Sequence, residues 1–220
     1  MIKLAIFDLD GTLLDTLDTI TYYVNKTLQK YGIKPYAREE LRPFIGKGAR
    51  NLITRALEAR GALESLDFDE LFAYYNAEYD ASPYYLTHPY EGIPELIEEL
   101  KGAGISLAVL SNKPEISTRA CIEHFFRGFD IIRGGRAEVP LKPAPDALYS
   151  IMDELSVTPM EVAYIGDSEV DIETMKNAPV AIPISVTWGL RTTGELKAAS
   201  PIPETVFCDT PSEVYAVITR

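Results

Sequence analysis

The stretch "IFDLDGTLLDT", residues 6–16, passes directly from apolar residues into two carboxylates, Asp8 and Asp10. The residues before them, 4–7, are apolar at every position rather than at alternate ones. Such a run is typical of a central strand that is covered on both faces. Two carboxylates so close together repel each other unless a cation or a chemical role holds them there. The stretch therefore predicts a buried strand that ends in a functional site.

Five further apolar segments favour strands, and helical patterns separate them. Residues 105–110, 162–165 and 180–186 give the clearer strands, and residues 129–132 and 205–207 give weaker ones. Helices are expected at 94–101, 146–155 and 211–218, from apolar residues spaced three and four apart. Strand and helix alternate from about residue 89 onward. This order predicts an α/β fold with a Rossmann-like parallel sheet and right-handed crossovers.

Residues 16–86 break this alternation. Three helical stripes fall within residues 17–31, 52–57 and 71–79, and no segment between them has a convincing strand pattern. We therefore expect an inserted all-helical cap at 16–86 and an α/β core made of 1–15 and 87–220. The links between them are predicted near 14–16 and 86–90.

The composition limits the possible functions. The 220 residues are 46% hydrophobic and carry a net charge of −12, which argues against binding to nucleic acid. Cys121 and Cys208 stand alone in apolar contexts, as reduced thiols of a cytoplasmic protein do. No segment has the pattern of a membrane span or a signal peptide. We expect a cytoplasmic protein that binds neither nucleic acid nor membranes.

Polar residues follow three of the expected strands and one loop. Besides Asp8 and Asp10, these are Ser111, Asn112 and Lys113 in "LSNK", Lys142 in "LKPAP", and Asp167, Ser168 and Asp171 in "GDSEVD". In open parallel sheets, ligands bind at the carboxyl ends of the strands. Each motif alone is commonly a turn or a helix cap. Their order at successive strand ends predicts that they meet at one site.

The residue types at this site indicate phosphoryl transfer. Carboxylate ligands without a nearby His or Cys favour Mg²⁺, which often bridges to phosphate. An ionised Asp8 can attack phosphorus, and Asp10 can give a proton to the leaving oxygen. Lys142, the Ser111 hydroxyl and the loop amides, including that of Asn112, can surround the phosphoryl oxygens.

Four motifs, "DLDGTLLDT", "LSNK", "LKPAP" and "GDSEVD", resemble in order those of the haloacid dehalogenase superfamily. The resemblance implies a Rossmann-like core, a helical cap and Mg²⁺-dependent chemistry through an aspartyl-phosphate. It implies that Asp8 is the nucleophile and Asp10 the acid and base. It further implies phosphate binding by Ser111 and Lys142, and a metal ion held by Asp8, the Asp10 carbonyl and Asp167, with Asp171 at its edge.

The cap segment "FIGKGARNLITRAL", residues 44–57, resembles that of phosphoglycolate phosphatases. By this resemblance Lys47 or Arg50 meets a substrate carboxylate, although both are equally compatible with ordinary surface charge. The chain departs from that group at Arg136, where an acidic residue is usual, and at Pro179.

The expected function is hydrolysis of a small phosphorylated metabolite, with 2-phosphoglycolate as the leading substrate. The same site could instead serve a pyrophosphatase, a nucleotidase or a phosphosugar mutase. A receiver domain that is phosphorylated and signals is the alternative without catalysis, although its acidic pair is spaced differently. A monomer and a homodimer are both compatible with the sequence.

Overall fold

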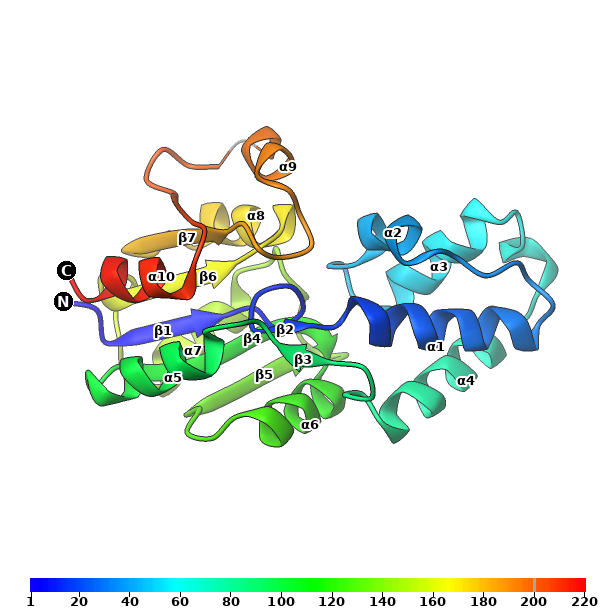
Figure 1. Cartoon of the computed structure of the whole chain (residues 1–220), viewed down its shortest axis with the longest axis horizontal. Helices are drawn as coiled ribbons and strands as arrows, with labels where there is room; N and C mark the ends of the chain where they lie inside the picture. Colours follow the sequence, from blue (N-terminus) through cyan, green and yellow to red (C-terminus); the bar gives the residue numbers. More distant parts are fainter. Residues whose placement is uncertain (200) are drawn as a thin grey trace.

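A six-stranded parallel sheet forms the centre of the molecule (Figure 1). The structure is a computed structural model that describes residues 1–199 and 201–220. The strand order is β5-β4-β1-β6-β7-β8, so that β1 (Leu4–Phe7) lies between β4 and β6. From β1 the chain builds one side of the sheet and then crosses to the other. The carboxyl end of β1 is therefore the switch point, where such sheets bind ligands.

The expected α/β fold with a parallel sheet is confirmed, and most predicted elements occur within a few residues of their expected bounds. The other strands are β2 (Leu14–Asp15), β3 (His88–Pro89), β4 (Ser106–Pro114), β5 (Ile131–Gly135), β6 (Val162–Gly166), β7 (Ile182–Val186) and β8 (Val206–Cys208). The helices are α1 (Leu17–Lys30), α2 (Arg38–Leu41), α3 (Ala49–Ala59), α4 (Phe68–Ala81), α5 (Ile93–Gly102), α6 (Glu115–Phe125), α7 (Asp146–Glu154), α8 (Glu169–Asn177), α9 (Thr193–Ala198) and α10 (Pro211–Ile218).

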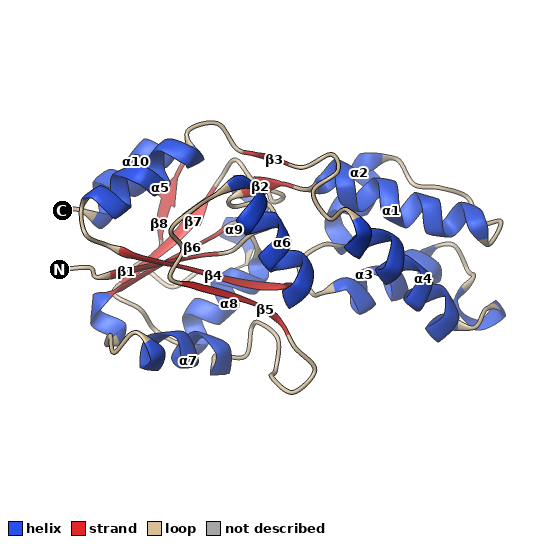
Figure 2. Ribbon diagram, turned by 90° about the horizontal axis from the view of Figure 1, so that it is seen from below, coloured by secondary structure: helices blue, strands red, loops and turns tan. Residues whose placement is uncertain are grey.

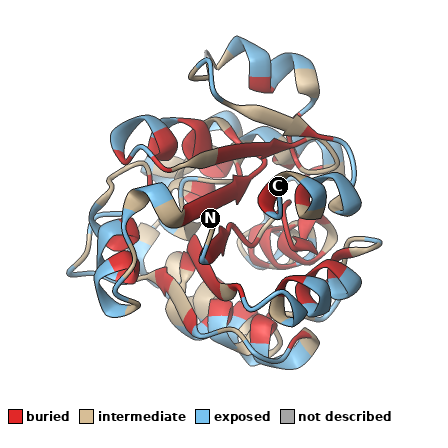
Figure 3. Cartoon of the chain, turned by 90° about the vertical axis from the view of Figure 1, so that its left-hand side faces the viewer, coloured by how far each residue is buried: buried red, intermediate tan, exposed pale blue. Residues whose placement is uncertain are grey.

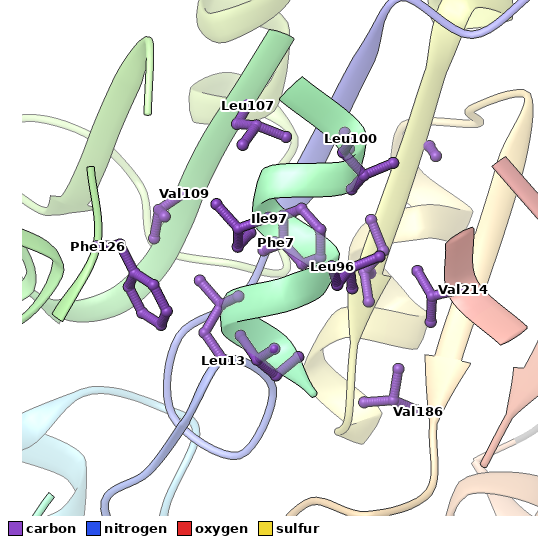
Figure 4. Packing of buried hydrophobic residues seen from close by; sticks show 14 of the residues in the cluster. Phe7, Leu13, Leu96, Ile97, Leu100, Leu107, Val109, Phe126, Val186 and Val214 are labelled. Carbon is purple, nitrogen blue, oxygen red and sulfur yellow. The ribbon is translucent and has the colours of Figure 1, made fainter. Parts of the chain in front are cut away.

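Alternate residues of the central strands face two separate apolar layers. Phe7 of β1 packs in the layer that includes Leu96, Ile97 and Leu100 of α5 (Figure 4). Ile6, its neighbour, faces the other layer, which α7, α8 and α9 cover. Because both faces are buried, every position of β1 is apolar, and its four residues have no exposed surface. Figure 3 shows this burial along the strands, with the exposed residues on the outer sides of the helices.

Helices α1–α4 form a second body that is set apart from the sheet (Figure 1). They share an apolar cluster whose members come chiefly from α1, α3 and α4, including Leu28, Ile53 and Leu71. We call residues 16–86 the cap and the remainder the core. Two short strands, β2 and β3, pair antiparallel where the chain leaves and re-enters the core, and Figure 2 shows them between the sheet and the cap.

Some elements have no counterpart among the expected ones. Helices α2, α6, α8 and α9 and the ribbon of β2 and β3 were not assigned from periodicity. Strand β4 also continues beyond the apolar run to Pro114 and so includes Ser111, Asn112 and Lys113. Among the described residues, no helix is both long enough and apolar enough to cross a membrane.

Candidate active site

Three aspartates meet at the carboxyl edge of the sheet. Strands β1 and β6 run parallel with Phe7 opposite Ile165, which places Asp8 and Asp167 just beyond the same edge. Asp171 joins them from the first turn of α8. One carboxylate oxygen from each of the three lies within 4.8 Å of the others. Asp167 and Asp171 are fully buried, and Asp8 is 8% exposed.

Local hydrogen bonds hold Asp171 in place. Ser168 is the N-cap of α8, and its Oγ accepts a hydrogen bond from the Asp171 backbone amide at 3.3 Å. In return, the Ser168 backbone amide donates to Asp171 Oδ2 at 3.1 Å. This reciprocal capping fixes the carboxylate of Asp171 at the helix start and turns it toward the core. Asp171 is therefore not one of the solvated residues on the surface of α8, because its side chain has no exposed surface.

Lys142 supplies the positive charge next to the aspartates. Its Nζ lies 2.9 Å from Asp8 Oδ1 and 2.7 Å from Asp171 Oδ1, and it donates to the Tyr164 hydroxyl at 3.1 Å. Burial favours the neutral amine, but the charges of Asp171 and Asp8 raise the pKa of Lys142 well above its ordinary value. Lys142 is therefore charged, and its charge lowers the pKa of Asp171 against the effect of burial.

The negative charges of Asp8 and Asp167 are less well balanced by nearby positive charge. Burial raises the pKa of Asp8 to about 7, although Lys142 opposes this change. Burial, followed by the charges of Asp171 and Asp8, raises the pKa of Asp167 well above its ordinary range. Asp167 accepts hydrogen bonds from Thr12 Oγ1 at 3.0 Å and from the Leu190 amide at 2.7 Å, but no ion pair to it occurs in the described part of the chain.

These observations fit a bound divalent metal ion. Three buried carboxylates face one ammonium group, so that the cluster carries excess negative charge in a poorly solvated place. The backbone is also tight around Asp167. A Cβ at Gly11, whose φ is +91°, would lie 2.2 Å from Asp167 Oδ2, and one at Gly189 would lie 2.4 Å from the same atom. The donor set of Asp8, Asp167 and Asp171 could therefore hold a metal ion.

A pocket of about 680 Å³, including its open mouth, lies between this cluster and the cap. From the core side, Asp8, Asp10 and Ser111 line it. From the cap side, its walls come from α1, the start of α3, the loop before α3, and α4. A small ligand in this pocket can touch the aspartates and the cap at the same time.

The residues expected to bind phosphate differ in what their side chains do. Ser111 lies in β4, three residues before the strand ends at Pro114, and lines the pocket together with Asp8. Its Oγ accepts from the Lys113 amide at 3.3 Å. Both polar atoms of the Asn112 side chain form hydrogen bonds to backbone atoms of neighbouring segments, so this side chain has a supporting role. Its Oδ1 accepts from the Lys142 amide at 2.8 Å, and its Nδ2 donates to the carbonyls of Lys142 and Gly46 at 2.9 and 3.0 Å.

The structure does not bring Lys47 and Arg50 into the pocket. The Arg50 guanidinium forms an exposed ion pair with Asp69 at 2.8 Å and lies over the Phe68 ring, because α3 turns this residue toward α4. Lys47 is exposed and does not line the pocket. Arg136 pairs with Glu115 outside the pocket.

Sequence reasoning missed the part of the site where the cap meets the core. Lys113 Nζ donates to Asp10 Oδ1 at 3.0 Å and to the Tyr79 hydroxyl of α4 at 2.5 Å. Arg191 donates to the carbonyls of Ile45 and Arg42 in the cap at 2.8 and 3.1 Å. The sequence placed Lys113 next to Ser111 and Asn112, which was a usable signal. It gave no signal for the polar contacts of Tyr79 and Arg191, whose partners lie far away along the chain.

Comparison with known proteins agrees with this geometry. Residues 5–183 match the family described as haloacid dehalogenase-like hydrolase. The phosphoglycolate phosphatase of Vibrio parahaemolyticus is 33% identical over 206 residues, which cover 91% of this chain and 90% of the relative. The enzyme of the same name from Aquifex aeolicus is 30% identical, with coverages of 92% and 90%. A crystal structure of a candidate phosphoglycolate phosphatase from Lactobacillus delbrueckii subsp. bulgaricus superposes with a TM-score of 0.90, at 30% identity and 98% coverage of both chains.

Proposed function

The chain belongs to the haloacid dehalogenase-like hydrolase family, and from this premise we propose that it is a Mg²⁺-dependent phosphatase of a small phosphorylated metabolite. The observation that carries the proposal is the meeting of Asp8, Asp167 and Asp171 with Lys142 in one buried cluster, from which Asp8 reaches the pocket beneath the cap. The names of the relatives favour 2-phosphoglycolate as the substrate. Its hydrolysis would give glycolate and phosphate.

Asp8 is the proposed nucleophile. Its carboxylate attacks phosphorus, a bond forms between Asp8 and the phosphoryl group, and the bond from phosphorus to the ester oxygen breaks. Burial raises the pKa of Asp8 to about 7 even though Lys142 lies 2.9 Å away and lowers it. Positive charge beyond that of Lys142 is therefore needed to keep the carboxylate ionised at neutral pH. The oxygen-only ligand set is one that Mg²⁺ prefers, and the bound ion would supply further charge for the phosphoryl oxygens.

Asp10 is the proposed acid and base. It lines the same pocket as Asp8 and lies two residues further along the chain. In the first step it gives a proton to the leaving oxygen, which departs as an alcohol. In the second step it takes a proton from the water that attacks the aspartyl-phosphate, which releases phosphate and restores Asp8. The Ser111 hydroxyl and the backbone amide of Asn112 are the proposed donors to the phosphoryl oxygens.

The experiment that tests this proposal is a panel of phosphorylated metabolites assayed with Mg²⁺ and with a chelator. Phosphate release from 2-phosphoglycolate that requires Mg²⁺ would support the proposal. Isomerisation of a sugar phosphate without net phosphate release would instead indicate a mutase. Stable phosphorylation of the protein without turnover would contradict an enzymatic function.

A further inference from the structure

The pocket contains a single cationic side chain among the residues that line it. These lining residues, all within the described part of the chain, are mostly apolar, small or neutral, and three are acidic: Asp8, Asp10 and Asp80. Lys113 is the cation. Its side chain is 5% exposed, so its charge is poorly screened by solvent and acts strongly on whatever enters the pocket. The proposed function places the phosphoryl group against Asp8 and Lys142. Any further anionic group on the substrate meets one cationic side chain in the lining of the pocket, that of Lys113.

Lys113 is only partly satisfied by the protein. Its Nζ carries three protons and donates to Asp10 Oδ1 at 3.0 Å and to the Tyr79 hydroxyl at 2.5 Å. In the described residues it has no third acceptor. The Tyr79 hydroxyl accepts from Lys113 and, in the same part of the chain, donates to no protein atom. One N–H of Lys113, from the core, and the O–H of Tyr79, from the cap, thus have no acceptor in the described residues. They lie at adjacent positions of the pocket wall and can donate to a ligand.

The position of this pair relative to the leaving oxygen limits the ligand. This step rests on the proposed function, in which Asp10 protonates the ester oxygen and must lie within about 2.6–3.2 Å of it. Lys113 Nζ is 3.0 Å from Asp10 Oδ1 and 2.5 Å from the Tyr79 hydroxyl of the cap, and all three residues line the same pocket. A group joined to the ester oxygen through one carbon stays close enough to that oxygen to reach Lys113. A group that is several bonds further from the ester oxygen lies beyond the reach of Lys113.

We propose that Lys113 and Tyr79 recognise a substrate carboxylate attached to the carbon that bears the ester oxygen. The substrate class is then the phosphate esters of short 2-hydroxy acids, of which 2-phosphoglycolate is the smallest. Asp80, in the same pocket wall, accepts from Ser117 Oγ at 2.5 Å and adds negative charge to the pocket. This charge disfavours leaving groups with a second distant anion, such as sugar bisphosphates.

The closing experiment compares 2-phosphoglycolate with ethyl phosphate, which has a methyl group in place of the carboxylate. The measured quantity is the ratio of kcat/KM for the two esters. Lys113→Met removes the charge at similar length and is expected to lower this ratio at least about 30-fold, the effect of losing one partner of a buried charge pair. Any damage to Asp10 affects both esters alike and cancels from the ratio. Tyr79→Phe is expected to lower the ratio about tenfold.

A second ester controls for length. In 3-phosphonooxypropionate the carboxylate lies one carbon further from the ester oxygen, and Lys113→Met is expected to change its kcat/KM relative to ethyl phosphate less than about threefold. An effect as large as that on 2-phosphoglycolate would overturn the position of the subsite.

Each outcome separates this inference from the proposed function. Wild-type protein that hydrolyses neither ester would refute the phosphatase itself. Wild-type protein that hydrolyses both esters with equal kcat/KM would leave the phosphatase standing and overturn the carboxylate recognition. An unchanged ratio in Lys113→Met, with both esters slowed equally, would assign Lys113 to positioning Asp10. If that variant does not fold, the ratio in Tyr79→Phe decides by itself.

Discussion

The two ends of the pocket are built in different ways. At the core end, Asp8 lines the pocket, and strand ends and buried hydrogen bonds fix it together with the adjoining Asp167 and Lys142. At the cap end, the walls come from helices of a separate body, joined to the core by the ribbon of β2 and β3 and a small set of polar contacts. A site that transfers a phosphoryl group needs fixed geometry. A site that admits and releases a substrate needs a wall that can move. Under the proposed function, the chemistry lies in the core, and the choice of substrate lies where Lys113 of the core meets Tyr79 of the cap.

The first prediction concerns the core end and carries the largest effect. Asp8→Asn keeps the shape of the side chain but removes the nucleophile, so kcat for phosphate release should fall by about 10⁴-fold or more. Circular dichroism should show an unchanged fold. Residual turnover within tenfold of the wild type would exclude Asp8 as the nucleophile.

The second prediction tests the metal ligands. Asp167→Asn should weaken Mg²⁺ binding by about 100-fold, because a neutral amide replaces one of three buried carboxylates. The concentration of Mg²⁺ required for half-maximal activity measures this change. Asp146→Asn is the matched control, since Asp146 is an exposed aspartate in the first turn of α7, and it should leave this concentration unchanged. Equal behaviour of the two variants would remove Asp167 from the ligand set.

The third prediction concerns the contact between the two ends. Arg191 holds the cap carbonyls of Ile45 and Arg42 and also pairs with Glu169 at 2.8 Å. Arg191→Met should destabilise the closed position of the cap, and kcat/KM should fall about tenfold, chiefly through KM. A fall confined to kcat would mean that Arg191 affects the chemistry rather than the closure.

The fourth prediction concerns metal binding and pH. The pKa of Asp8 is raised from 3.8 to about 7 by burial, so the neutral carboxyl is favoured in the folded, metal-free protein. The raised pKa of Asp8 stabilises the folded, metal-free protein fully below pH 3.8, and this stabilisation is lost as the pH rises through about 7. Bound Mg²⁺ reverses this preference, because it needs the ionised carboxylate.

The increase in Tm on adding Mg²⁺ should therefore be larger at pH 8 than at pH 5.5. At 100 times the Kd, the metal should contribute about 2.7 kcal/mol, or about 5–11 °C for a chain of this size. Thermal unfolding at the two pH values measures the difference. An increase in Tm that does not depend on pH would contradict the account of Asp8.

The smallest effect is expected at the outer surface of the cap. Arg50→Met removes an exposed ion pair with Asp69 and lies outside the pocket, so kcat/KM for 2-phosphoglycolate should change less than about twofold. A large rise in KM would bring Arg50 back as the carboxylate ligand and would displace Lys113 from that role.

The difference between the core end and the cap end of the pocket also explains how much of the site could be predicted from the sequence. The site at the core end follows from local patterns, because an apolar strand followed by Asp8 or Asp167 must place that carboxylate at the carboxyl edge of a parallel sheet. The cap end depends on how two bodies pack. The apolar stripe of α4 predicted that Tyr79 is buried, but burial alone does not say that its hydroxyl meets Lys113. The charges of Lys47 and Arg50 suggested a ligand site, yet helix α3 turns Arg50 toward Asp69.

The central claim is that Asp8 carries the phosphoryl group between the two steps. Its most direct test is mass spectrometry of the Asp10→Asn variant, quenched during turnover of an aryl phosphate with Mg²⁺. An aryl oxide leaves without a proton from Asp10, so the first step proceeds while the second step lacks its base. Phosphate should therefore accumulate on the peptide that contains Asp8 and should be absent in Asp8→Asn. Phosphate on another residue, or turnover of the wild type with no phosphorylated protein at any time, would contradict the account.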